Sequence, residues 1–287
     1  MNTQSTYQWQ LGKEQWQLPQ EGAIMGIVNT TPDSFSDGGQ YGELATALAH
    51  AEQLIAEGAD IIDIGGESTR PGATPTTLEE EHQRTIPLIK ALRASQPTAR
   101  ISIDTRHPSI AQAALEAGAD ILNDITGLAQ AEMRQLAAQY RCGVILMHMQ
   151  GTPETMQQNP SYKDIIAEQR QFFQERISAA LAEGVQLAQI CIDPGIGFGK
   201  TLGHNLQLIK HLSELRPPID HAQQIPIMMA LSRKRFMGEI LSNPELGRGT
   251  IATLSMSLLS AEQGANIHRV HEVAPLKTAL SLRAALQ

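Results

Sequence analysis

Two sets of side chains in this sequence could do chemistry, and each set combines residues that lie far apart in the chain. The first set offers hydrogen-bond acceptors directly after short apolar runs, namely Asp104, Asn123 and Asp193. Because a buried acid or amide needs a donor, a flat heterocycle with adjacent N–H groups would satisfy all three. The second set is cationic and would suit a phosphate-bearing group; it consists of Arg70, Arg233, Lys234, Arg269 and His271.

The sequence from residue 189 to residue 200, QICIDPGIGFGK, predicts a buried strand that ends in a functional loop. Its apolar start leads to Asp193, and Pro194 stops the strand because proline cannot donate to a β-ladder. The glycines at positions 195, 197 and 199 permit positive φ angles or the close approach of a flat ligand. An ordinary strand-to-helix turn would need one glycine and no acid, so we interpret this stretch as part of a site.

Two further loops have the composition of flaps. The loop at residues 29–39, NTTPDSFSDGG, is too long for a simple strand-to-helix connection and contains a turn-prone core. Its Phe35 is flanked by hydroxyl groups and could cover an aromatic substrate. The segment at residues 67–73, ESTRPGA, could form a second flap. Both loops are therefore expected to close over a bound molecule.

The candidate side chains follow short apolar runs that repeat with one rhythm: a strand, a polar tip, then a helix rich in Ala and Leu. The predicted strands are residues 23–28, 60–64, 100–104, 120–123, 143–148, 189–193, 226–231 and 267–270. The predicted helices are residues 43–57, 79–95, 108–117, 131–140, 162–184, 204–215, 246–263 and 273–286. This alternation predicts a single (β/α)8 TIM barrel of the α/β class, whose strand tips converge on one cavity.

An N-terminal β-hairpin is predicted before the barrel. Residues 7–18 alternate in polarity around Gly12 and Lys13, which places Trp9 and Trp16 on one face. We expect this hairpin to plug one end of the barrel. No linker-like composition interrupts the chain, so the predicted domains are a cap at residues 1–22 and a barrel at residues 23–287.

Charge and composition narrow the class of partner. The 287 residues carry a net charge of −8, which argues against nucleic acid because phosphate neutralisation needs clustered Lys and Arg. Cys142 and Cys191 lie in or beside apolar runs, so they predict small core residues in a reducing compartment. The N-terminal residues lack a signal-peptide pattern, and no run of about 18 apolar residues predicts a membrane span. We therefore expect a cytoplasmic protein without a membrane partner.

Some of the polar residues have a plainer explanation. A lone acid at a strand tip often caps a helix or pairs with a neighbouring Arg, and we assign Asp63 and Asp124 to that role. His148 or His271 alone would also be structural. No His and Cys set has zinc spacing, and no GxSxG elbow accompanies a Ser-His-Asp order. Zinc hydrolysis and acyl transfer are therefore not favoured.

Eight motifs, in order along the chain, make it similar to a known family. They are MGIVNTTPDSFSDGG, IDIGGESTRPGA, SIDT, NDITG, LMHMQGTP, DPGIGFGK, LSRK and RVH. Together they resemble the dihydropteroate synthase family of pterin-binding enzymes from about Ala23 to the end of the chain. The resemblance implies a transferase of folate biosynthesis. It would condense 6-hydroxymethyl-7,8-dihydropterin pyrophosphate with p-aminobenzoate to 7,8-dihydropteroate and pyrophosphate, with Mg²⁺ as cofactor.

The resemblance also implies roles for individual residues. The pterin would contact Asp104, Asn123, Ile125, Met147, Asp193 and Lys234. The pyrophosphate would contact Asn29, Arg70, Arg269 and His271, and Asn29 would also be associated with Mg²⁺. The p-aminobenzoate would contact Thr69, Arg70, Pro71, Phe198, Ser232 and Phe35. The residues implied to be catalytic are Lys234, Asp104, Asp193, Arg269 and His271.

The implied chemistry leads to two hypotheses. The C–O bond would break to give a carbocation stabilised by the pterin, which the aniline nitrogen attacks without a covalent enzyme intermediate. Sulfonamides, which imitate p-aminobenzoate in size and charge, would compete on the Ser232 side of the pocket. The chain departs from the family pattern at Thr30, Ala230 and Arg235, which bears on rate, affinity and sulfonamide sensitivity.

Other functions stay open on the sequence. A methyltetrahydrofolate-dependent corrinoid methyltransferase domain would share the barrel but would not need the motifs at residues 232–234 and 269–271. A non-catalytic pterin-binding barrel would keep the cavity without turnover. A sugar-phosphate aldolase would place a lone Schiff-base lysine inside a strand, and none of the predicted strands contains one. The apolar helix at residues 251–261 could be buried against a second subunit or against its own barrel, and the family's habit favours a homodimer.

Overall fold

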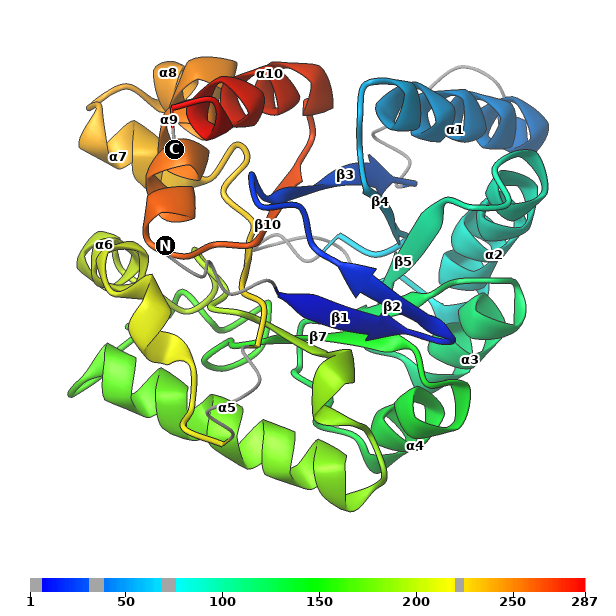
Figure 1. The fold of residues 1–287 in the computed structure, drawn as a ribbon, viewed down its shortest axis with the longest axis horizontal. Helices are drawn as coiled ribbons and strands as arrows, with labels where there is room; N and C mark the ends of the chain where they lie inside the picture. Colours follow the sequence, from blue (N-terminus) through cyan, green and yellow to red (C-terminus); the bar gives the residue numbers. More distant parts are fainter. Residues whose placement is uncertain (1–6, 31–38, 69–75, 220–224, 287) are drawn as a thin grey trace.

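A computed structural model describes residues 7–30, 39–68, 76–219 and 225–286 (Figure 1). Eight parallel strands form one sheet in the order β8-β7-β6-β5-β4-β3-β10-β9. The strands are β3 (Ala23–Asn29), β4 (Ile61–Gly65), β5 (Arg100–Asp104), β6 (Ile121–Asp124), β7 (Gly143–Met147), β8 (Ile190–Asp193), β9 (Met228–Met229) and β10 (Ile267–Val270). A parallel bridge between Ile192 and Ile227 joins the two ends of the sheet and closes the ring. The predicted (β/α)8 barrel is thus confirmed.

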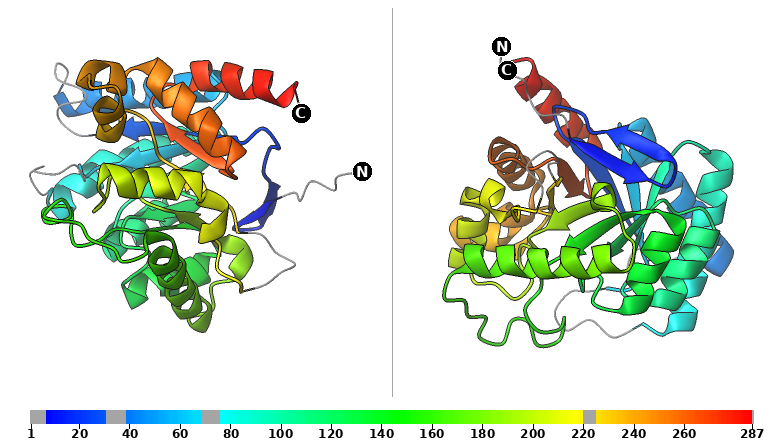
Figure 2. Two further views of the ribbon diagram at one scale, coloured as in Figure 1. Left: turned by 90° about the vertical axis from the view of Figure 1, so that its left-hand side faces the viewer. Right: turned by 60° about the horizontal axis from the view of Figure 1, so that its bottom comes forward.

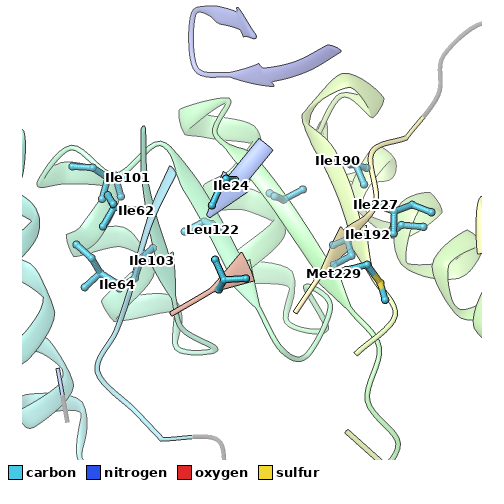
Figure 3. Packing of buried hydrophobic residues seen from close by; sticks show 14 of the residues in the cluster. Ile24, Ile62, Ile64, Ile101, Ile103, Leu122, Ile190, Ile192, Ile227 and Met229 are labelled. Carbon is cyan, nitrogen blue, oxygen red and sulfur yellow. The ribbon is translucent and has the colours of Figure 1, made fainter. Parts of the chain in front are cut away.

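Helices surround the barrel (Figure 1). They are α1 (Gly39–Ala56), α2 (Leu78–Ser95), α3 (Pro108–Glu116), α4 (Ala131–Tyr140), α5 (Ile165–Ala182), α6 (Leu202–Lys210), α7 (Arg235–Ile240), α8 (Pro244–Arg248), α9 (Thr250–Glu262) and α10 (Val273–Ala284). Single-turn 3₁₀ helices are η2 (Leu187–Gln189) and η3 (Leu212–Leu215). Buried Ile, Leu and Val side chains of the strands pack against the inner faces of these helices; Figure 3 shows several, including Ile62, Ile64 and Ile103.

Three predicted elements differ from the structure. The strand expected at residues 226–231 shortens at both ends to β9; at its start Pro226 has no N–H and contributes only its carbonyl, which accepts from the Ile192 amide at 3.0 Å. The helix expected at residues 204–215 divides into α6 and η3. The helix expected at residues 246–263 divides at Gly249, whose ψ of 161° is extended, and the short helix α7 was not predicted.

The N-terminal hairpin consists of β1 (Gln8–Leu11) and β2 (Glu14–Gln17), with Trp9 opposite Trp16 as predicted. Trp9 is fully buried, and its indole Nε1 donates to the Gln189 carbonyl at 2.7 Å. The two Trp residues share a cluster with side chains near the starts of the strands, such as Met25 and Ile61. The hairpin therefore covers the N-terminal end of the barrel (Figure 2), opposite the strand tips. The domain boundary between residues 1–22 and 23–287 stays a prediction.

Both cysteines are free and buried, as their apolar surroundings predict. Within the described ranges, no helix combines the length and apolar character needed to cross a membrane.

Candidate active site at the carboxyl ends of the strands

An ionic cluster joins β10 to acidic side chains of β4 and β5, the second and third strands along the sheet from β10. The Arg269 guanidinium donates from Nε to Asp63 Oδ2 at 2.6 Å and from Nη2 to Asp104 Oδ2 at 2.8 Å. Asn123 extends the cluster, because its Nδ2 lies 3.3 Å from Asp63 Oδ2. Asp63 is fully buried, whereas the side chains of Arg269 and Asp104 each keep 18% of their exposure. Asp104 and Arg269 therefore remain accessible to a bound molecule.

Burial dominates the electrostatics of this cluster. It raises the pKa of Asp104 to about 7, with Arg269 opposing that shift and Asp63 adding to it. Burial would also lower the pKa of Arg269, but the carboxylates of Asp63 and Asp104 outweigh it and raise that pKa. Arg269 is thus a permanent cation placed between two acids, and Asp104 is the acid whose charge changes near neutral pH.

Asp193 stands at the tip of β8, beside Met147 at the tip of β7. Its Oδ1 accepts from the Gly195 amide at 2.8 Å, and burial raises its pKa against the nearby cations of Lys234 and Arg269. The three glycines of this loop have φ angles of 65°, 83° and 65°, so the backbone requires them as predicted. A Cβ at Gly195 would also overlap the carbonyl oxygen of His148.

Lys234 enters the same region from the segment between β9 and α7. Its Nζ lies 4.3 Å from the centre of the half-buried Phe198 ring, which is cation–π distance. Ser232 precedes it, and the Ser232 hydroxyl lies 2.9 Å from His271 Nδ1. The structure therefore brings together polar groups from the segments after β8, β9 and β10. Arg233 and Arg235, in contrast, are exposed.

Other predicted residues also lie at strand tips. Asn29 ends β3 and is half-buried opposite Gly65, while Ile125 and Met147 are buried. The remaining predicted contacts lie outside the described residues; they are Phe35, Thr69, Arg70 and Pro71. Their roles, and those of the other candidate residues, stay predictions.

The two acids that we assigned to local partners behave differently. Asp124 accepts from the amides of Thr126 and Leu128 at 2.8 and 3.0 Å, so it fastens its own loop. Asp63 does pair with an Arg, as predicted, but that Arg belongs to the candidate site. Sequence reasoning could not find this link because 206 positions separate the two residues.

Lys200 is a second residue of this region to which the sequence assigned no role. It is 4% exposed, and its Nζ lies 3.1 Å from His148 Nδ1 and 2.8 Å from the Phe198 carbonyl oxygen. Burial, with Lys200 adding to it, lowers the pKa of His148 to about 3, so this imidazole is neutral. The sequence did contain a signal for such a role: Lys200 is a cation in a Gly-rich loop that follows a buried strand.

The site has no built-in multidentate metal cage in the part of the chain that the structure describes, since no three His, Cys, Asp or Glu residues there are grouped to hold an ion. The site combines carboxylate and amide acceptors with cations, and the cation of Arg269 lies among the acceptors. Such an arrangement can hold a flat donor-rich ring while its anionic substituent contacts the cations.

Comparisons with known proteins agree with this geometry. The family model described as "Pterin binding enzyme" matches residues 25–271. Dihydropteroate synthase from Synechocystis is 46% identical over 251 residues, which are 87% of this chain and 85% of that protein.

Two solved structures are similar along almost their whole length. Xanthomonas albilineans dihydropteroate synthase with 4-aminobenzoic acid has a TM-score of 0.87 and 40% identity, covering 99% of each chain. Burkholderia cenocepacia dihydropteroate synthase complexed with 7,8-dihydropteroate has a TM-score of 0.87 and 39% identity, covering 98% of this chain and 96% of that one. This chain therefore belongs to the pterin-binding enzyme family and, within it, to the dihydropteroate synthases.

Proposed function

We propose that this protein is a transferase of folate biosynthesis that joins a dihydropterin to p-aminobenzoate. The substrates are 6-hydroxymethyl-7,8-dihydropterin pyrophosphate and p-aminobenzoate, and the products are 7,8-dihydropteroate and pyrophosphate. Relatives of this length and identity carry that name, and the solved relatives hold 4-aminobenzoic acid or 7,8-dihydropteroate. The observation that carries the proposal is the ionic cluster of Asp63, Asp104 and Arg269 beside the cations of the β9 and β10 ends.

The pterin ring is proposed to lie on the acceptor floor. Asp104, Asn123 and Asp193 accept its N–H donors, while the buried side chains of Ile125 and Met147 contact its faces. Lys234 lies near the same region. It is close enough to Asp193 for its positive charge to lower the pKa of that acid. Each acceptor is at least half-buried, so a hydrogen bond from a pterin donor forms in a low-dielectric region, where such bonds are stronger than in water.

The pyrophosphate is proposed to lie against Arg269, His271 and Asn29, which end neighbouring strands. Arg269 already holds two carboxylates in a fork, and an approaching phosphate can share its remaining N–H donors. Negative charge grows on the pyrophosphate as it departs, so these donors stabilise the transition state more than the ground state.

Magnesium fits this arrangement as a cofactor. Asn29 offers one amide oxygen at the end of β3, and Mg²⁺ commonly takes one or two protein oxygens, substrate phosphates and water. When bound, the ion neutralises charge on the leaving pyrophosphate. The protein's own part is to orient that pyrophosphate with Asn29, Arg269 and His271.

The p-aminobenzoate is proposed to lie between the Phe198 ring and Ser232. Phe198 offers an aromatic face next to Lys234, and the Ser232 hydroxyl can donate to a carboxylate. The bond between the pterin methylene carbon and the pyrophosphate oxygen breaks, and the electron pair leaves with pyrophosphate. The aniline nitrogen then forms the new C–N bond and releases a proton, so no covalent enzyme intermediate is needed.

A pyrophosphate-release assay tests this function. We expect rapid release only when the pterin pyrophosphate, p-aminobenzoate and Mg²⁺ are all present, and formation of 7,8-dihydropteroate in equal amount. Replacing Lys234 by Met should reduce the rate by at least about tenfold, the effect of losing one charge-assisted contact. Binding of the pterin without turnover would instead indicate a non-catalytic pterin-binding barrel, and methyl transfer to a corrinoid would indicate the methyltransferase.

We also propose that the protein is a homodimer. Several large apolar side chains are exposed on α8, α9 and α10, which lie side by side (Figure 1). Leu246, Ile251 and Leu282 are 61%, 81% and 66% exposed, respectively. A second copy of the chain could pack closely against these side chains, because α9 also carries small residues such as Ala and Ser. A cytoplasmic location is proposed from the two free, buried cysteines.

A further inference from the structure

The loop between β8 and α6 is held by side chains rather than by regular secondary structure. Three consecutive carbonyls, at residues 197–199, each accept one side-chain donor. The donors are Gln157 Nε2 at 2.6 Å, Lys200 Nζ at 2.8 Å and the Tyr162 hydroxyl at 2.8 Å, in the order of the carbonyls. These three donors hold the loop together with Asn205 Oδ1, which accepts from the Gly197 amide at 2.9 Å, and with the Gly195 carbonyl, which accepts from the Phe198 amide at 3.0 Å.

Lys200 is the buried member of the three. Its ammonium has three protons, and three acceptors surround it: the Phe198 carbonyl, the His148 carbonyl at 3.2 Å and His148 Nδ1 at 3.1 Å. This match of donors to acceptors favours the cation. Burial, with Lys234 adding to it, lowers the pKa of Lys200 to about 7, and Asp193 opposes that shift. A buried lysine with all its donors used is a fixed structural contact.

The carbonyl that Lys200 holds belongs to the residue whose ring faces the site. Phe198 is half-buried, and its ring centre lies 4.3 Å from Lys234 Nζ. Lys200 also ties this loop to the tip of β7 through His148. Without the ammonium, the Phe198 and His148 carbonyls would lose this donor, and His148 Nδ1 would keep only the Gln169 side-chain amide at 3.3 Å, so the loop would shift to satisfy the carbonyls.

We propose that Lys200 is a positioning residue that sets the place of the Phe198 ring and thereby the affinity for the aryl amine substrate. The proposal rests on the proposed function, since it takes p-aminobenzoate as the molecule against that ring. Lys200 touches neither substrate. It acts through the Phe198 backbone. Of the pterin acceptors, Asp104 and Asn123 belong to β5 and β6, and Asp193 is fixed by β8 and by the Gly195 amide rather than by Lys200.

The first test replaces Lys200 by Met, which keeps the length of the side chain and removes its donors. Lys210→Met is the matched control, because Lys210 is exposed on α6. In pyrophosphate-release assays, we expect Lys200→Met to raise KM for p-aminobenzoate about tenfold while KM for the pterin pyrophosphate changes less than about twofold. Lys210→Met should change neither constant. Equal rises in both constants for Lys200→Met would overturn the proposal.

A double-mutant cycle then tests whether Lys200 acts through Phe198. Once Phe198→Ala has removed the ring, adding Lys200→Met should raise KM for p-aminobenzoate no further. If the two effects multiply as independent changes, Lys200 does not act through the ring and the proposal is wrong.

A milder variant keeps the test available if Lys200→Met does not fold. Tyr162→Phe removes only the hydroxyl that holds the next carbonyl, so it should raise KM for p-aminobenzoate alone, by a smaller factor. An unchanged KM in this variant would overturn the proposal. If the wild-type protein releases no pyrophosphate, the proposed function is wrong as well. If the wild type turns over and Lys200→Met is unaffected, only this inference is wrong.

Discussion

The link between Asp63 and Arg269 allows a sharp test, because Asp63 lies behind the site and belongs to none of the proposed substrate contacts. Asp63→Asn keeps the size of the side chain and removes its charge. The structure then leaves Arg269 with one carboxylate, Asp104, at 2.8 Å. We expect this change to affect both the stability of the barrel and the binding of the pterin.

The expected size follows from the burial of the pair. Asp63 is fully buried, and removing one partner of a buried ion pair costs about 3–5 kcal/mol when the other charge is stranded. Because Arg269 keeps Asp104, we expect the free energy of unfolding to fall by about 2–3 kcal/mol. Arg269 should also bind Asp104 more strongly, which withdraws an acceptor and weakens pterin binding about tenfold.

Urea denaturation followed by circular dichroism measures the first effect, and titration calorimetry with the pterin pyrophosphate measures the second. Glu239→Gln is the control, because it removes an ion pair in which Arg235 is 88% exposed and Glu239 is 41% exposed. Such pairs contribute little to stability, so this control should unfold like the wild type. A change for Asp63→Asn below about 0.5 kcal/mol, the range of ordinary surface substitutions, would refute the reasoning.

Three further predictions concern the site and its surroundings. Since burial raises the pKa of Asp104 to about 7, its accepting carboxylate is lost as the pH falls through that value. Pterin affinity measured by calorimetry should therefore weaken between about pH 8 and pH 6, and Asp104→Asn should remove this dependence; a wild-type affinity that is flat over the range would count against it. Sulfonamides should compete with p-aminobenzoate in steady-state kinetics, and inhibition that ignores the p-aminobenzoate concentration would contradict the pocket proposed beside Ser232. Ile251→Glu, which places a charge on the exposed face of α9, should convert the proposed dimer to a monomer in light scattering, whereas an unchanged mass would exclude that interface.

Much of the fold could be predicted because it follows from local properties of the chain. The strands at residues 100–104 and 267–270 were placed without error, since each is a short run with β-branched residues that a helical pattern precedes and another follows. The hairpin register followed from Gly12, whose φ of 60° makes the turn that sets Trp9 opposite Trp16. The errors at residues 226–231 and at Gly249 arose where a proline and an extended glycine, rather than the hydrophobic pattern, interrupted the element.

The candidate site could be predicted in part for the same reason. Parallel strands place their carboxyl ends at one end of the barrel, so a list of strand tips already placed Asp104, Asn123 and Asp193 at the same end. The types of the side chains after the strands also separated a set of hydrogen-bond acceptors from a set of cations. The sequence by itself thus determined which polar residues follow the strands and what chemical character they bring to the strand ends.

Only the tertiary structure decided which of these groups are partners. Arg269 reaches Asp63 and Asp104 because the sheet sets β10 beside β3, and therefore close to β4 and β5. Lys200 finds His148 because two loops meet behind the tip of β7. Periodicity reports only whether a position is buried, whereas charge pairing in a low-dielectric interior depends on distances of a few ångströms between residues that the chain itself does not bring close.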